Sequence, residues 1–287
     1  QNGGGFAITP GTTVSLPKLD TLGNASVSFT GAGAIDAPLL TNFAGSVLTL
    51  TDPAQTVSTG GLSQIDNARF ILSNATVFDQ IIDSDYILTS AAIANATVLS
   101  ATESGTRLDA HSVTKIDSYA DHWGVNTRTI SATNGGAIDL SGVTLLRGGS
   151  GTSGGLDSVR VVAETGGTID WSSLQQIDGY VTFATDVASF SLPSLTHAGG
   201  VSYELPSSAA LTLPELLSQS GGGFAIPPGT TVSLPKLETL GNASVSFTGA
   251  GALDAPLLTN FTGSVLTLTD PAQTVSTGGL SQIDNSR

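Results

Sequence analysis

The segment Phe190-Ser-Leu-Pro-Ser-Leu195 recurs as Leu211-Thr-Leu-Pro-Glu-Leu216, as Val232-Ser-Leu-Pro-Lys-Leu237 and as Leu253-Asp-Ala-Pro-Leu-Leu258. The first residues of these six-residue phrases lie 21 positions apart. Short apolar stretches that recur at a fixed short period, with Gly or Pro at the corners, are typical of solenoids, in which each repeat forms one coil of a stack. The phrase therefore predicts a solenoid with one coil per phrase.

The same phrase extends through the rest of the chain. It starts at Val14, Ile35 and Val57, and again at Ile169. Looser matches start at Val77, Leu108 and Ile138. Six of the intervals between successive starts are short, at 20–22 positions, and three are long, at 30 or 31 positions. Together these intervals run from Val14 to its counterpart Val232. The sequence therefore predicts nine coils in this span, three of them long.

Within each phrase the apolar residues have the spacing of short β-strands. A second apolar pair follows in the short coils, with its members two positions apart, as in Val27 and Phe29 or Leu48 and Leu50. This alternation is the periodicity of a strand. Pro at the fourth position ends the first strand, because proline has no N–H to donate to a ladder. The sixth position predicts a continuous inward row: Leu19, Leu40, Leu62, Ile82, Val113, Val143, Leu174, Leu195 and Leu216.

A longer repeat contains this short one. Residues 1–69 recur as residues 219–287, and only six of the 69 positions differ. Near-identity over this length indicates a recent duplication. We expect residues 1–218 to form one full unit of nine coils and residues 219–287 to begin the next unit, continuous with the first. We also expect a longer array of such units, with a single duplication inside one domain as the alternative.

The short coils resemble a known family. The segments Ser172–Phe183 (SSLQQIDGYVTF) and Leu192–Tyr203 (LPSLTHAGGVSY) are similar in outline to coils of the receptor L domain, a right-handed β-helix. The resemblance implies an all-β, right-handed parallel β-helix. The chain departs from that family in lacking cysteine and in its three long coils, and no ligand-binding position of the family maps onto it. As a whole the chain resembles the repeat region of giant bacterial surface proteins.

Composition narrows the class of function. The chain has 287 residues, a net charge of −14, only 11% charged residues, and neither Cys nor Met. The acidic balance argues against a nucleic-acid partner, because phosphate binding needs clustered cations. The absence of Cys excludes disulfides and thiol chemistry. No segment has the pattern of a signal peptide or of a membrane span. These features favour an extracellular or cell-surface bacterial protein.

One column of acidic residues is a candidate metal site. The second position of the phrase holds Asp109, Asp139 and Asp170 in three consecutive coils. Stacked at the strand spacing, these carboxylates should repel one another and raise one another's pKa. Calcium prefers such oxygen ligands and is the candidate cation. The alternative is a solvated acidic strip that Arg107 or Lys115 partly neutralises.

The long coils also hold residue types that carry chemistry in polysaccharide-cutting β-helices. We consider Asp109 and Asp170 as a possible carboxylate pair for a glycoside hydrolase, although stacked acidic coils produce such pairs by chance. Three loops are expected, at residues 103–109, 119–129 and 148–156. The other polar and aromatic candidates in these coils are Arg107, His111, His122, Trp123, Arg128, Arg147 and Trp171.

These observations predict a structural protein, not an enzyme. A solenoid grows in one dimension by adding units, so tandem copies would build a fibre, a stalk or a surface filament. Its partners would be further copies along the axis, sister filaments or surface glycans. A glycan- or cell-binding adhesin module is the alternative, and a polysaccharide-active enzyme is a further one. No cofactor is expected apart from the candidate calcium.

Overall fold

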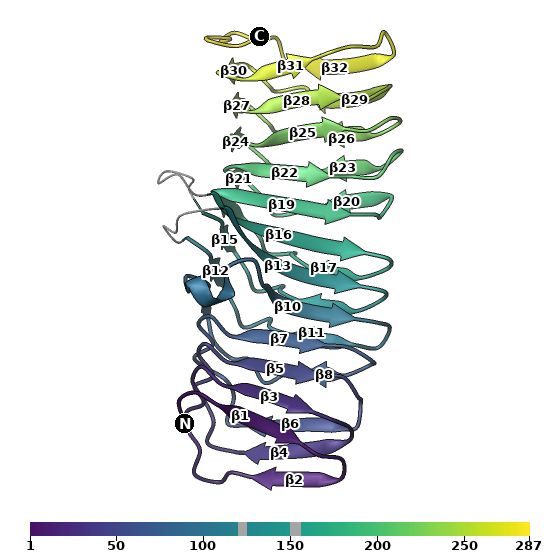
Figure 1. The fold of residues 1–287 in the computed structure, drawn as a ribbon. Coiled ribbons are helices and arrows are strands. Elements are labelled where there is room, and N and C mark those ends of the chain that lie inside the picture. The colour runs from purple at the N-terminus through teal and green to yellow at the C-terminus, as the bar shows by residue number, and fades with distance from the viewer. Residues whose placement is uncertain (120–124, 150–155) are drawn as a thin grey trace.

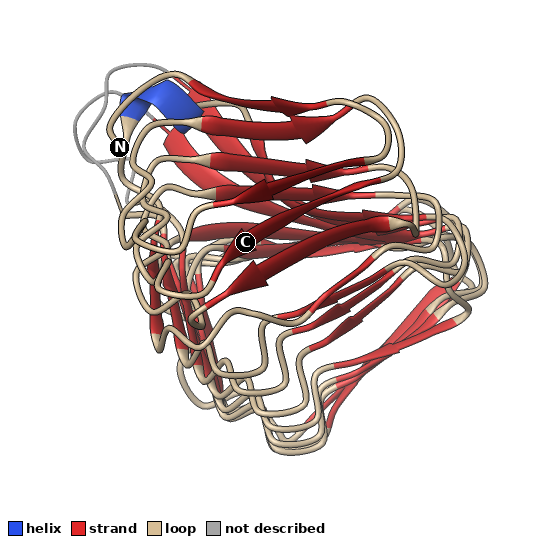
Figure 2. Cartoon of the chain, turned by 90° about the horizontal axis from the view of Figure 1, so that it is seen from below, coloured by secondary structure: helices blue, strands red, loops and turns tan. Residues whose placement is uncertain are grey.

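The chain winds into coils that stack along one axis, and each coil crosses three faces of a prism (Figures 1 and 2). The computed structural model describes residues 1–119, 125–149 and 156–287. Every strand pairing within these residues is parallel, and the fold is the expected right-handed parallel β-helix. We call the three faces the long sheet, the second face and the third face.

The long sheet holds one strand from each coil and runs unbroken from end to end. Its strands are β1 (Gly5–Ile8), β3 (Ser26–Phe29), β5 (Val47–Leu50), β7 (Arg69–Leu72), β10 (Thr97–Thr102), β13 (Val125–Thr133), β16 (Leu156–Glu164), β19 (Tyr180–Thr185), β22 (Val201–Glu204), β25 (Gly223–Ile226), β28 (Ser244–Phe247) and β31 (Val265–Thr267).

The second face carries the first strand of each phrase and is divided into three sheets. The first sheet contains β2 (Thr12–Ser15), β4 (Gly33–Ala37) and β6 (Gln55–Thr59). The second contains β8 (Val77–Phe78), β11 (Arg107–Asp109), β14 (Ala137–Asp139) and β17 (Thr168–Asp170). The third contains β20 (Ser189–Ser191), β23 (Ala210–Thr212), β26 (Thr231–Ser233), β29 (Gly251–Ala255) and β32 (Gln273–Thr277). Pairing is interrupted between β6 and β8 and between β17 and β20.

The third face is one sheet of short strands. Its members are β9 (Asp85–Ile87), β12 (Lys115–Asp117), β15 (Leu145–Arg147), β18 (Gln176–Asp178), β21 (His197–Ala198), β24 (Ser218–Ser220), β27 (Thr239–Gly241) and β30 (Asn260–Thr262). One 3-10 helix, η1 (Ala91–Ile93), precedes β10. No helix in the described part of the chain is long and apolar enough to cross a membrane.

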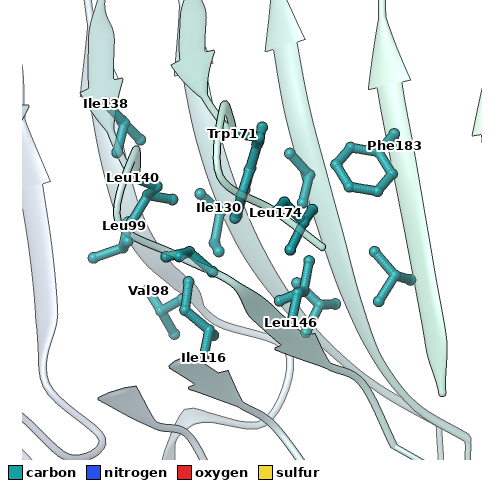
Figure 3. Packing of buried hydrophobic residues seen from close by; sticks show 14 of the residues in the cluster. Val98, Leu99, Ile116, Ile130, Ile138, Leu140, Leu146, Trp171, Leu174 and Phe183 are labelled. Atoms are coloured by element: carbon teal, nitrogen blue, oxygen red, sulfur yellow. The ribbon is translucent and has the colours of Figure 1, made fainter. Parts of the chain in front are cut away.

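The inward-facing aliphatic and aromatic residues form one continuous core (Figure 3). Side chains that alternate along a strand point to opposite faces, so one residue of each pair enters the core. The predicted row is buried at Leu40, Leu62, Val113 and each later member, and Leu19 is half-buried in the first coil. An aromatic stack continues the core between coils, where the rings of Phe183, Tyr203 and Phe224 lie nearly parallel with centroids 6.1 and 5.4 Å apart.

The fourth coil corrects two details of the prediction. Leu108 pairs with Phe78, so the phrase of this coil begins at Phe78 and not at Val77. Ile81 pairs with Leu62 and is 1% exposed, whereas Ile82, which the sequence places in the inward row, is 55% exposed. The phrase of this coil is shortened at its corner, so counting six residues from its start overshoots the inward position.

The three long coils differ from expectation in where their extra residues lie. Residues 103–106 form a tight turn and Arg107–Asp109 is strand β11, so the loop expected at 103–109 is absent from this described segment. The extra residues of that coil lie between β9 and β10 and include η1. In the next two long coils the extra residues extend β13 and β16 to nine residues each. The remaining parts of the two expected loops include residues 120–124 and 150–155, which lie outside the described residues.

Candidate functional site

The acidic column forms as the sequence predicts. Asp109 pairs with Asp139 in the ladder of β11 and β14, and Asp139 pairs with Asp170 in the ladder of β14 and β17. In each coil the aspartate ends its strand and accepts a hydrogen bond from the backbone N–H two positions later. The donors are His111 N at 3.1 Å, Ser141 N at 3.1 Å and Ser172 N at 2.9 Å. These bonds explain why Asp suits the end of the strand.

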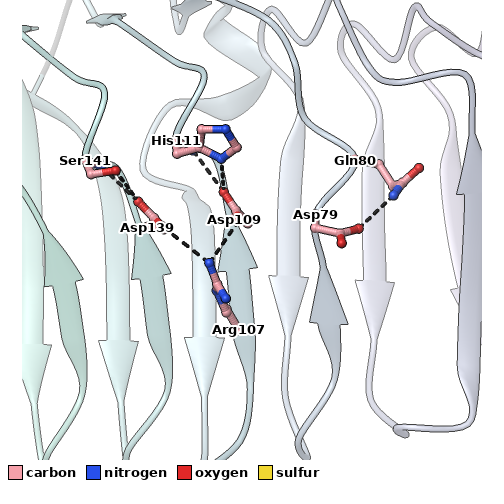
Figure 4. Close-up of polar contacts among 7 residues, drawn as sticks. All are labelled: Asp79, Gln80, Arg107, Asp109, His111, Asp139 and Ser141. Carbon is pink, nitrogen blue, oxygen red and sulfur yellow. Dashed lines mark hydrogen bonds and ion pairs between the residues drawn. The ribbon is translucent and has the colours of Figure 1, made fainter.

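Protein groups already occupy the carboxylates of Asp109 and Asp139 (Figure 4). Arg107 Nη2 lies 3.0 Å from Asp109 Oδ2 and 3.4 Å from Asp139 Oδ2, so one guanidinium bridges two coils. His111 Nδ1 lies 2.6 Å from Asp109 Oδ1. The Oγ of Ser141 donates to Asp139 Oδ1 at 2.7 Å. Lys115 pairs instead with Asp117 on the third face, at 3.0 Å.

At Asp139 the electrostatics differ from the prediction that stacked carboxylates raise one another's pKa. Burial acts to raise the pKa of Asp139, but the hydrogen bonds from Ser141 and the nearby guanidinium of Arg107 outweigh it, and this pKa lies below its usual value. The hydrogen bond to Asp109 raises the pKa of His111 above its ordinary value. Arg107, Ser141 and His111 thus favour the charged form of Asp139, which repulsion alone would disfavour.

The candidate calcium at Asp109, Asp139 and Asp170 stays a prediction. Among the described residues, no group of three or more His, Asp or Glu side chains is arranged to hold a metal ion. Asp109 and Asp139 share Arg107, and Asp170 is the one member of the column that makes no ion pair among the described residues. Of the two alternatives left open by the sequence, an acidic strip partly neutralised by Arg107 matches this arrangement.

The other polar residues of the long coils lie on different faces. Arg107 and His111 belong to the second face, whereas Arg147 lies on the third face, 3.3 Å from Asp117 and 3.8 Å from Asp178. Arg128 points into the interior. The proposed hydrolase pair, Asp109 and Asp170, is separated by Asp139 and its bound guanidinium. His122 and Trp123 lie outside the described residues.

A buried ion pair inside the long coils is a feature that the sequence analysis does not predict. Arg128 on β13 is fully buried, and its Nη1 lies 3.9 Å from Asp157 Oδ1 on β16, which is also buried. Burial lowers the pKa of Arg128, and the charge of Asp157 opposes that shift. Both residues occupy inward positions, because they alternate along β13 and β16 with the buried Ile130 and Val159. The alternation of Asn126, Arg128 and Ile130 is the signal that could have placed Arg128 inside.

Strand pairing joins the two copies of the repeated sequence at their boundary. Strand β24 contains Gln219, the first residue of the second copy, and pairs with β21 before the boundary and with β27 after it. On the second face, Leu211 of β23 pairs with Val232 of β26, which is the same 21-residue step as in the other short coils. A salt bridge joins Lys236 Nζ to Glu215 Oε2 at 2.7 Å across this boundary. The solenoid therefore continues through the boundary without an interruption.

Comparisons with protein-family models, with curated protein sequences and with solved structures find no match to this chain. The strand topology supports the resemblance noted from the sequence at the level of architecture, which is a parallel β-solenoid.

Proposed function

We propose that this chain is a structural segment of an extracellular fibre, stalk or surface filament of a bacterial cell, built from tandem solenoid units and also adhesive. Its partners along the axis are further copies of the same unit. The cell-surface location is proposed because the chain is acidic and repetitive and resembles in outline the repeat regions of bacterial surface proteins.

The observation that carries this proposal is a difference in burial between the two copies of the same sequence. Phe6, Val14, Leu16 and Leu19 in the first copy are half-buried, whereas their counterparts Phe224, Val232, Leu234 and Leu237 are buried. The second set packs against the coil that precedes it, which includes Leu211 and Leu216. At the one boundary that the chain contains, the last coil of the first copy therefore covers the first coil of the second.

The burial of the third coil depends in the same way on the coil that follows it. Leu62 is 1% exposed because the fourth coil covers it, whereas its counterpart Leu280 is 42% exposed. Ile65 and Ile283 differ in the same way. Inside the chain the apolar row of a coil is thus covered by the coils on both sides, as in solenoid repeats whose stability depends on interfaces between nearest neighbours.

The direction of the hydrogen bonds suits a filament that bears tension or resists proteolysis. In a parallel β-helix the ladder bonds run along the axis from coil to coil. The long sheet carries such bonds through both copies, from β1 to β31. Near-identical units give every segment the same stiffness, and their number sets the length.

The test is the length of chains that contain two, four and eight copies of the unit formed by residues 1–218, measured by electron microscopy. Nine coils at the strand spacing predict rods that lengthen by about 43 Å per unit. As a control, the same units are joined through Gly/Ser linkers of ~20 residues, which should give separate, flexibly connected bodies. Beads of irregular separation in the directly joined chains would contradict the proposal.

A further inference from the structure

The wall of the solenoid opens between β17 and β20, which is one of the two places where the pairing of the second face is interrupted. On the long sheet the same two coils are joined by β16 and β19, with six residue pairs from Ser158↔Tyr180 to Ala163↔Thr185. On the third face they are joined by β18 and β21. On the second face, where both strands are described, no ladder connects β17 to β20. The opening is therefore local, and the flanking sheets hold its two sides in place.

A groove of about 360 Å³ lies at this opening, lined by residues from both strands. Hydrogen bonds close it at each end. At the end where β17 and β20 begin, Thr165 N donates to Asp186 Oδ2 at 2.7 Å. At the end where both strands have finished, Ser194 Oγ donates to the carbonyl of Ser172 at 2.6 Å. The volume is within the range of small-molecule pockets. The closed ends exclude an extended chain that would run through the groove along the strands.

The floor of the groove is apolar because the opening exposes the core. Ile169 and Phe190 occupy inward positions, but both are only half-buried, whereas their neighbours Ile138 and Leu211 are buried. Trp171 takes the place that Leu192 holds in the next coil, and its larger ring packs edge-on against Phe183 at 6.1 Å. Trp171 also lines the groove, and its Nε1 is buried without a hydrogen-bond partner among the described residues.

The rim of the groove is polar. Thr168 N donates to Gly136 O and Asp170 O accepts from Leu140 N, so these two residues bond to the residues that flank β14. Alternate residues of a parallel strand direct their backbone groups to opposite edges. The N–H and C=O of Ile169 therefore face the groove. Asp170, Ser189 and Ser191 add a carboxylate and two hydroxyls to the lining.

We propose that this groove binds one ring of a neutral sugar, as the terminal or branching residue of a glycan. A pyranose ring has an apolar C–H face, which matches Ile169 and Phe190, and a rim of hydroxyls, which matches the carboxylate, hydroxyl and backbone groups. The lining, all of it within the described residues, contains one carboxylate and no Lys, Arg or His. An acidic sugar or a phosphate would therefore be repelled.

The inference rests on the adhesive part of the proposed function and not on its structural part. The second copy of the repeated sequence continues the same stack, so an array of units would carry one groove in each unit. A single sugar ring binds weakly, and a row of regularly spaced grooves would convert weak contacts into firm attachment.

The test uses saturation-transfer NMR on the whole chain, residues 1–287. The probes are methyl β-D-glucopyranoside, methyl β-D-galactopyranoside, methyl α-D-mannopyranoside and N-acetylglucosamine, with glucuronic acid as the charged counterpart. We expect at least one neutral probe to bind with a dissociation constant on the order of 1 mM, with the strongest transfer to one C–H face of its ring. Glucuronic acid should not bind.

Two matched variants locate the site. Ser191→Tyr fills the rim of the groove, and Ser233→Tyr places the same side chain at the equivalent position of β26, whose ladders are complete on both sides. We expect Ser191→Tyr to weaken binding at least ~tenfold and Ser233→Tyr to leave it unchanged, with circular dichroism showing that both variants fold. Equal binding by both variants would overturn the proposal. Binding of no neutral probe, or equal binding of glucuronic acid, would also overturn it, and neither result would change the rod lengths expected above.

Discussion

Replacing Leu237 with Ala should lower the free energy of unfolding by about 2–5 kcal/mol, whereas Leu19→Ala should cost less than about half as much. The two residues are the same position of the repeated sequence. Leu237 is fully buried between its own coil and the coil before it, so truncation leaves a cavity. Leu19 is half-buried in the first coil, where water fills the space that the missing methyl groups leave.

Urea unfolding followed by far-ultraviolet circular dichroism measures the difference between these two variants. The comparison is internal, because the substitution, the local sequence and the phrase are shared. Equal losses at Leu19 and Leu237 would mean that the coil before the boundary contributes nothing to the packing of the second copy. The continuous solenoid would then be wrong at the boundary between units.

Replacing Gly222 with Ala should also destabilise the protein much more than the same change at its counterpart, Gly4. Both glycines have positive φ, 63° and 74°, so both variants carry a backbone cost of about 1–2 kcal/mol. A Cβ at Gly222 would lie 2.0 Å from the carbonyl oxygen of Val201 in the preceding coil. A Cβ at Gly4 would meet only the side chain of Gln1, at 3.5 Å.

The clash at Gly222 should add ~3 kcal/mol to the shared backbone cost, because the backbone of Val201 is held in a ladder and cannot move aside cheaply. Thermal unfolding of the two variants measures this excess. The result that would contradict the structure is a Gly222→Ala variant as stable as Gly4→Ala, because it would show that β22 and β25 do not approach one another as closely as the structure places them.

Much of the fold could be predicted because the phrase repeats almost without change in the short coils. Leu195, Leu216 and Leu237 occupy the same place in phrases that differ at few positions, and all three are buried in the same row. The prediction failed at Phe78 and Ile81, where the corner of the phrase is shorter than in the other coils. A register error of one position exchanges the inward and outward sides of a strand. This is why counting along the phrase puts Ile82 inside although it lies at the surface.

The acidic column was predictable because it depends on strands that pair, whereas the groove depends on two strands that do not pair. Asp109, Asp139 and Asp170 align because their strands pair, and pairing follows from spacing. The groove arises because β17 and β20 do not pair, although the step from Ile169 to Phe190 is as long as the step from Phe190 to Leu211, which do pair. Only Trp171, where the next coil has Leu192, marks the opening in the sequence.

The distance between Ser28 and Ser246 tests the continuous solenoid most directly. These residues are counterparts in the two copies, on β3 and β28 of the long sheet, and the chain has no Cys that would compete for a label. With nitroxides on Ser28→Cys and Ser246→Cys, double electron–electron resonance should give one narrow distribution centred near nine strand spacings, about 43 Å. A broad distribution, or a mean distance well short of that value, would show that the two copies do not stack in one solenoid.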